Sequence, residues 1–241
     1  MSNALQLVSQ VRSDLKRLNE RILHHPYLNA LEGGRVSRDA LRVFAGQQYH
    51  IITSDLRSIA LLVSRHGNLP SRKFFLNVLQ GEAAALDALH SFARALAMSG
   101  DDLEAFEPLP AAHAYCAFVA WLALYGSAAE LAGAFLVNFA AWGANCGRMS
   151  KALKERYNFT ESDLAFFNLF ANMLPFEEEA VAVIQGGLDR GIQPRLIHRA
   201  ARLLQGYELM YWDAMAEAAG DRKSTRLNSS HIQKSRMPSS A

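Results

Sequence analysis

Glu208 is the ionisable side chain whose neighbours in the sequence best suit chemistry. It lies in the segment GYELMYW, where Tyr207, Tyr211 and Trp212 flank it. A carboxylate among aromatic side chains on a helix is either half-exposed, or buried with partners and a raised pKa. The buried arrangement suits general acid or base catalysis. The sequence alone leaves both arrangements open.

A second polar feature lies on one face of an expected helix over 39–65. Gln48, Ile52, Asp55 and Ile59 follow a spacing of four, three and four residues, which places them on the same side of the helix. An amide and a carboxylate on an apolar face cost free energy unless they find partners or line a wet or ligand-filled pocket. The face is therefore either part of a site or a satisfied polar spot in a helical core.

Metal and nucleophile motifs are weak in this chain. There is no CxxC, HExxH, GxGxxG or P-loop sequence. Glu82 and His90 share an expected helix, but eight residues place them about 80° apart around its axis, which is awkward for one metal ion. Cys116 and Cys146 stand in apolar helical contexts, where a buried structural thiol is more common than a reactive one. We expect no metal and no cofactor.

The elements that must position these residues are helices. Half of the residues are apolar, Ala and Leu dominate, and no stretch alternates with period two for long enough to form a strand. Two asparagines, Asn138 and Asn145, interrupt an apolar stripe with helical spacing. Capping and breaking residues predict an all-α fold of about seven helices, over 3–23, 39–65, 72–98, 111–125, 128–156, 161–173 with a continuation beyond Pro175, and 194–219.

Composition limits the classes of partner. The last 21 residues, 221–241, carry five Lys or Arg and one acid, so the rest of the chain holds 20 bases and 22 acids. The basic pI is therefore no argument for nucleic acid. No run of 18 apolar residues predicts a membrane span, and two cysteines fit a reduced, cytoplasmic protein. We expect the stretch 221–241 to be disordered, and it resembles a translated sequencing adapter, so we assign it no function.

Five segments in this order resemble the TenA/PqqC group, which contains the thiaminase II-like proteins. They are HPYLNALEGGRVSRDALRVFAGQQYHI, ALHSFARAL, FEPLPAAHAY, AELAGAFLVNFAAWG and GYELMYW. The resemblance covers about 25–215. It implies one helical domain over 1–220 with a haem-oxygenase-like fold, which assembles as a homodimer or homotetramer.

The resemblance also implies roles for individual residues. Thiaminases of this group attack an aminopyrimidine with a cysteine and use a glutamate near the C-terminus as proton donor. That glutamate matches Glu208, but the cysteine position falls on Asn138, and Cys146 lies two helical turns further on. The aspartate that holds the pyrimidine falls on Gln48, and a tyrosine three residues later is replaced by Ile51. An amide is a poor nucleophile, so covalent catalysis at this position is excluded.

The resulting hypothesis is an enzyme that binds or hydrolyses a thiamin-related aminopyrimidine, with Glu208 as its acid or base. Aromatic positions of the group are kept as Tyr115 and Trp142. The predicted substrate-binding residues are Gln48, Tyr115, Asn138, Trp142 and Tyr207. The partner is thus a small heterocyclic substrate, with no nucleic acid and no membrane. The alternatives are a binding or regulatory protein that keeps the pocket without turnover, and an iron-dependent oxidase of the same fold, for which Glu82, His90, Glu130 and His198 are too loosely spaced.

Overall fold

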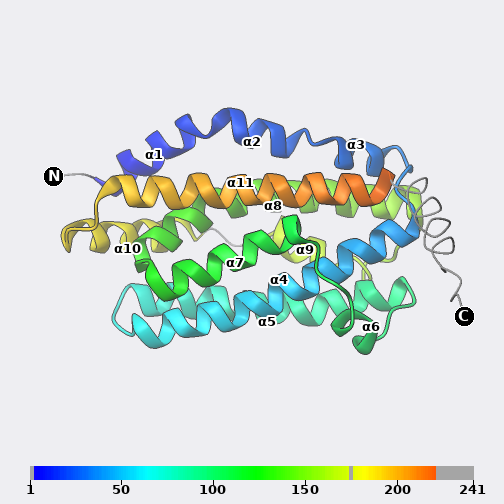
Figure 1. The fold of residues 1–241 in the computed structure, drawn as a ribbon, viewed down its shortest axis with the longest axis horizontal. Helices are drawn as coiled ribbons and strands as arrows, with labels where there is room; N and C mark the ends of the chain where they lie inside the picture. The colour runs from blue at the N-terminus through cyan, green and yellow to red at the C-terminus, as the bar shows by residue number, and fades with distance from the viewer. Residues whose placement is uncertain (1–2, 174–175, 221–241) are drawn as a thin grey trace, which may run out of the picture.

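The computed structural model describes residues 3–173 and 176–220, which form helices and no β-strand (Figure 1). The expected tail, 221–241, and the proline at 175 lie outside the described residues. The helical segments are α1 (Ala4–Asp14), α2 (Lys16–Leu23), α3 (Pro26–Glu32), α4 (Arg38–Arg65), α5 (Ser71–Ala95), α6 (Gly100–Glu104), α7 (Pro110–Tyr125), α8 (Ala128–Tyr157), α9 (Ala165–Ala171), α10 (Glu177–Asp189) and α11 (Pro194–Gly220).

The all-α prediction is confirmed, but the described segments outnumber the seven that the sequence suggested. The stretch expected to form one helix over 3–23 divides at Leu15, which has φ −91° and ψ 1°. The Leu15 side chain is buried, so the chain turns there while it keeps an apolar contact with the core. The remaining difference comes from the short helices α3 and α6, and from α9 and α10, which are separate helices where one helix over 161–173 with a continuation was expected.

Local capping chemistry explains where the long helices begin. The Ser37 hydroxyl accepts a hydrogen bond from the Ala40 backbone N–H at 3.2 Å and starts α4. Ser127 and Glu130 form a reciprocal capping box at the start of α8. Thr160 and Asp163 also exchange hydrogen bonds in the pattern of a capping box, but the residues after Thr160 make a turn, and the regular helix begins only at Ala165.

The long helices lie side by side, with α8 at the centre of the packing. It contacts α11, α10 and α9, while α4 packs against α5 and α7, and α7 also contacts α11. Figure 1 shows α1, α2 and α3 running along the outer side of α11, and α5 at the opposite edge of the bundle. Within the described residues, no helix is both long and apolar enough to span a membrane.

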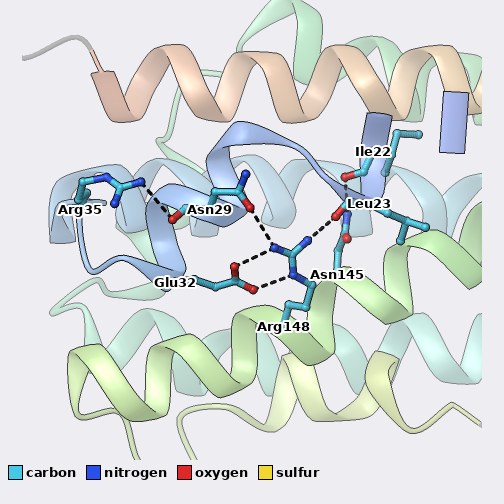
Figure 2. A network of polar contacts seen from close by, with 7 residues as sticks. All are labelled: Ile22, Leu23, Asn29, Glu32, Arg35, Asn145 and Arg148. Atoms are coloured by element: carbon cyan, nitrogen blue, oxygen red, sulfur yellow. Dashed lines mark hydrogen bonds and ion pairs between the residues drawn. The ribbon is translucent and has the colours of Figure 1, made fainter. Parts of the chain in front are cut away.

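Two residues of α8 hold the N-terminal segment onto this core (Figure 2). The Arg148 guanidinium donates to both carboxylate oxygens of Glu32, at 2.7 and 2.8 Å, and also to the Leu23 carbonyl oxygen. One turn earlier, the Asn145 amide donates to the Ile22 carbonyl oxygen at 3.3 Å. Asn145 interrupts the apolar stripe of α8 because it satisfies a carbonyl at the end of α2.

Replacement of Arg148 by Met should weaken this connection while it keeps the aliphatic stem in place. We expect the free energy of unfolding to fall by about 1–3 kcal/mol, since hydrogen bonds to a charged group are lost. Arg35→Met is the matched control, because Arg35 makes a single exposed contact with the Asn29 carbonyl oxygen (Figure 2). Urea unfolding measures both variants, and equal stabilities for Arg148→Met and Arg35→Met would contradict the prediction.

Candidate active site

Six helices meet around a small buried cavity of about 30 Å³. Five of the six residues proposed from the sequence line it, namely Gln48, Tyr115, Asn138, Trp142 and Glu208. The rest of the wall consists of Ile51, Ile52, Asp55, Glu82, Phe139, Phe170 and Tyr211. A volume of this size suits a water molecule.

Glu208 is buried on α11, with 3% of its surface exposed. Its Oε1 accepts a hydrogen bond from the Trp212 indole N–H at 2.8 Å, and its Oε2 accepts one from the Asn138 amide at 3.1 Å. Burial raises the pKa of the Glu208 carboxyl to about 7, although both hydrogen bonds lower it. The group can therefore take up or release a proton near neutral pH, which general acid or base catalysis requires.

Asn138 connects the polar groups of the cavity. The Tyr115 hydroxyl donates to its Oδ1 at 2.8 Å, and its Nδ2 donates to the Gln205 Oε1 at 2.8 Å as well as to Glu208. The Gln205 amide donates in turn to Asn19. Because these contacts fix which end of the amide donates, Asn138 always presents an N–H group to the carboxylate.

Tyr115 is placed by the turn that precedes α7. The Gln47 side chain on α4 donates to the Glu107 carbonyl oxygen at 3.1 Å and accepts from the Leu109 backbone N–H at 2.8 Å. Phe106 in the same turn lies directly on Gly46, where a Cβ atom would come within 2.3 Å of the ring. The turn therefore packs against the backbone of α4, and these contacts set where α7 begins relative to the cavity.

Asp55 and Glu82 also line the cavity, although neither was among the predicted substrate-binding residues. Both are at least nine-tenths buried, and the Asp55 Oδ1 atom has no hydrogen-bond partner among the described residues. Burial and the neighbouring Glu82 raise the pKa of Asp55 well above its usual value, and burial raises the pKa of Glu82 to about 7. The helical spacing of Asp55 from Gln48 had placed both on one face that could belong to a site, and both line the cavity.

A larger cavity of about 650 Å³ adjoins the small one, between α5, α9 and the start of α10. Glu82, Phe139 and Phe170 line both cavities. A pyrimidine ring is larger than the inner cavity. A ring ligand would therefore have to move the Phe139 or Phe170 side chain and extend into the outer cavity.

Other candidate residues lie outside the inner cavity. Tyr207 packs against Phe118, with ring centroids 5.2 Å apart, and is not part of the cavity wall, so we leave it out of the proposed site. Both cysteines are buried. Burial raises the pKa of the Cys116 thiol to about 12 and that of Cys146 well above its usual value, so neither is a thiolate at neutral pH.

The residues considered for an iron site do not converge. Glu82 lines the cavity, whereas His90 lies beside Tyr49, Glu130 caps the start of α8, and His198 contacts Asp14. Over the ranges that the structure describes, no three His, Cys, Asp or Glu side chains are grouped to hold a metal ion. The side chains that the structure describes therefore do not fit the iron oxidase alternative.

The sequence model of the TENA/THI-4/PQQC family matches residues 12–171. A 4-aminobenzoate synthase from Chlamydia muridarum is 31% identical over 108 residues, which are 43% of this chain and 46% of that protein. An aminopyrimidine aminohydrolase from Halalkalibacterium halodurans is 25% identical over 114 residues, 47% of this chain and 51% of the relative. The chain thus matches about half the length of these curated relatives.

Solved structures support the fold independently. A TenA homologue from Pseudomonas syringae superposes with a TM-score of 0.71 at 17% identity, covering 87% of this chain and 92% of that one. A haem oxygenase from Synechocystis superposes with a TM-score of 0.64 at 14% identity, covering 94% and 96%. The expected haem-oxygenase-like fold is confirmed.

Replacement of Glu208 by Gln should change how stability depends on pH. The folded-state pKa, about 7, is above the ordinary value of 4.5, so the carboxyl stabilises the fold below about pH 4.5, and this contribution is lost as pH rises to about 7. Between about pH 4 and pH 8, the difference in unfolding free energy between wild type and variant should change by on the order of 3 kcal/mol. Denaturant unfolding at several pH values measures it, and exposed Glu217→Gln should run parallel to wild type.

Proposed function

Because the chain belongs to the TENA/THI-4/PQQC family, we propose that it binds a flat heterocycle bearing an amino group and hydrolyses it with Glu208 as acid and base. The observation that carries this proposal is the buried Glu208 carboxyl at the cavity, held by Trp212 and Asn138. Gln48 and Asn138 would orient the ring through hydrogen bonds, and Tyr115 and Trp142 would form its walls.

The names of the two curated relatives support a ligand of this class. Both an aminopyrimidine and 4-aminobenzoate are flat aromatic rings that carry an amino group. They differ in charge, since 4-aminobenzoate also carries a carboxylate. Three carboxyl groups and no Lys, Arg or His line the inner cavity. Because an anion would be buried beside other acids without a counter-charge, the charge pattern favours the aminopyrimidine.

The proposed reaction is hydrolytic release of ammonia. Glu208 in its carboxylate form takes a proton from water as the water oxygen bonds to the carbon that carries the amino group. The protonated Glu208 then returns this proton to the nitrogen as the carbon–nitrogen bond breaks. Water therefore supplies the hydroxyl group of the product and one hydrogen of the ammonia. The pKa of about 7 lets one group serve both steps near neutral pH.

This mechanism needs no cysteine. The side chain at the expected nucleophile position is Asn138, whose amide donates a hydrogen bond to Glu208 rather than accepting a proton. Such a bond favours the charged carboxylate and would help it to act as a base after product release. The role we assign to Asn138 is therefore to position the carboxylate and the ring.

Ammonia release from a 4-aminopyrimidine tests the proposal in wild type, Glu208→Gln and the control Glu217→Gln, which lies on the same helix at an exposed position. We expect turnover in wild type and control, and a loss of kcat of at least about a hundredfold in Glu208→Gln, since general acid–base catalysis contributes about 10²–10⁴ in rate. Equal rates in Glu208→Gln and wild type would refute the role of Glu208. Tight binding without turnover in wild type would instead favour the binding-protein alternative.

The expected homodimer or homotetramer stays a prediction, and we propose that a second copy of the chain covers α7. This helix contains no Lys, Arg, Asp or Glu, and it exposes Trp121, Leu124 and Tyr125. Phe118 stacks on Trp121, and Met210 on α11, a helix that packs against α7, is also exposed. An uncharged face of this kind suits self-complementary contact around a two-fold axis. We expect Trp121→Glu to lower the mass measured by light scattering, and an unchanged mass would refute this surface.

A further inference from the structure

We propose that Gln205 and Asn19 are positioning residues for Glu208, on which they act through the side-chain amide of Asn138. Gln205 lies on α11 and Asn19 on α2, and neither lines the inner cavity, so neither is placed to touch a ligand there. The inference rests on the proposed function, in which Glu208 is the acid and base, and it adds to that function two amides that lie outside the cavity.

Gln205 is buried in a way that packing alone does not explain. It is 0% exposed and precedes Glu208 by three residues. Its Oε1 accepts a hydrogen bond from the Asn138 Nδ2 at 2.8 Å, and its Nε2 donates to the Asn19 Oδ1. A buried amide costs free energy that an apolar side chain of similar size avoids, so a residue that only filled space here would be better apolar.

The link between Asn19 and Gln205 decides which end of the Asn138 amide faces Glu208. Asn19 presents an oxygen, which attracts the Gln205 N–H group and thereby turns the Gln205 oxygen toward Asn138. That oxygen needs an N–H donor, and the second N–H of the same Asn138 amide then points at the Glu208 Oε2, at 3.1 Å. With the Asn138 amide turned over, two acceptor oxygens would face each other at Gln205.

The other partners of Asn138 do not fix its direction by themselves. The Tyr115 hydroxyl donates to the Asn138 Oδ1 at 2.8 Å, but a hydroxyl group can also accept a hydrogen bond. The Glu208 carboxylate requires an N–H donor, whereas protonated Glu208 can donate its O–H to the amide oxygen instead. The contact with Gln205 is therefore the one that keeps the N–H directed at Glu208 in both protonation states.

This direction affects how readily Glu208 ionises. An N–H held toward the carboxyl favours its charged form, and an amide that is free to turn favours it less. Loss of the link should therefore raise the pKa of Glu208 further above its ordinary value. The other titratable groups that face Glu208 or its partner Trp212 come from several elements and are left unchanged by the test: Asp55, Glu82, Tyr115, Cys146, Tyr211 and His25.

Carbon-13 NMR of the Glu208 side-chain carboxyl carbon tests the inference without any substrate. The full chain is labelled at glutamate, and the Glu208 signal is identified by its absence in Glu208→Gln. The pH titration of this signal is then followed in wild type, Gln205→Met, Asn19→Ala and Gln185→Met. Thermal melting of each variant checks that it is folded.

Gln185→Met is the matched control, because it makes the same substitution at another glutamine that holds the N-terminal segment. Gln185 on α10 accepts a hydrogen bond from the Ala4 backbone N–H at 3.0 Å and donates to Asp189. A change that follows only from a looser N-terminal segment should therefore appear in this control as well as in Gln205→Met.

We expect the titration midpoint of Glu208 to rise by about 0.5–1 in pH in Gln205→Met, the size that weakening one hydrogen bond to the charged form would give. Asn19→Ala should give a smaller rise, because Asn19 is half-buried and water can partly replace its oxygen. This milder variant keeps the test decisive if Gln205→Met does not fold. Gln185→Met should leave the midpoint unchanged.

A link that only held α2 against α11 would give a different result. The melting temperatures of Gln205→Met and Asn19→Ala would then fall while the Glu208 midpoint stayed at its wild-type value. An unmoved or lowered midpoint in the folded variants, or an equal rise in Gln185→Met, would overturn the inference.

Failure of this inference can be told apart from failure of the proposed function. If wild type releases no ammonia while the midpoint rises in the Gln205 and Asn19 variants, the hydrolase proposal fails and the positioning role stands. If wild type releases ammonia through Glu208 while the midpoint does not move, the hydrolase stands and the positioning role fails. If both stand, the acid limb of kcat/KM should rise together with the midpoint.

Discussion

The burial of the Glu208 carboxyl is the constraint on which the rest of the site depends. A carboxyl group removed from water is costly unless donors surround it, and here Trp212 supplies one donor and Asn138 the other. The Asn138 amide is itself fixed because Tyr115 donates to its oxygen and Gln205 accepts from its nitrogen. One buried acid is therefore held by side chains of α8 and α11, and through Asn138 by Tyr115 of α7.

Two asparagines in the apolar stripe of α8 form hydrogen bonds at two different places in the fold. Asn138 turns toward the cavity and holds Glu208. Asn145, two turns later, holds the end of α2 together with Arg148, which reaches Leu23 and Glu32 (Figure 2). Both asparagines interrupt the stripe for the same physical reason, since each pairs with a polar group that packing has removed from water.

The cavity differs chemically from that of a thiaminase that works through cysteine. An amide occupies the position of the nucleophile, and the thiols of Cys116 and Cys146 are buried and protonated. The inner wall offers acidic groups in place of a thiol nucleophile, because its ionisable side chains are carboxyls and tyrosines. Such a wall favours ligands that donate protons or carry positive charge, which is the property that the proposal for Glu208 uses.

The sequence by itself determined the helical fold and its family, and it named five of the twelve residues of the inner wall. Helical periodicity and caps such as Ser37 are local properties, so they can be read without knowing the packing. The same is true of the spacing that puts Gln48 and Asp55 on one face. The sequence could not decide whether Glu208 is buried, because burial depends on which helices cover that face of α11.

Tertiary structure alone decided which residues meet. It brought Glu82 of α5 beside Asp55 of α4, and it directed Tyr211 to the cavity while Tyr207, one turn earlier, packs on Phe118. It also divided the first expected helix at Leu15. These outcomes depend on the crossing of helices far apart in the chain, and helical spacing within one segment carries no information about that crossing.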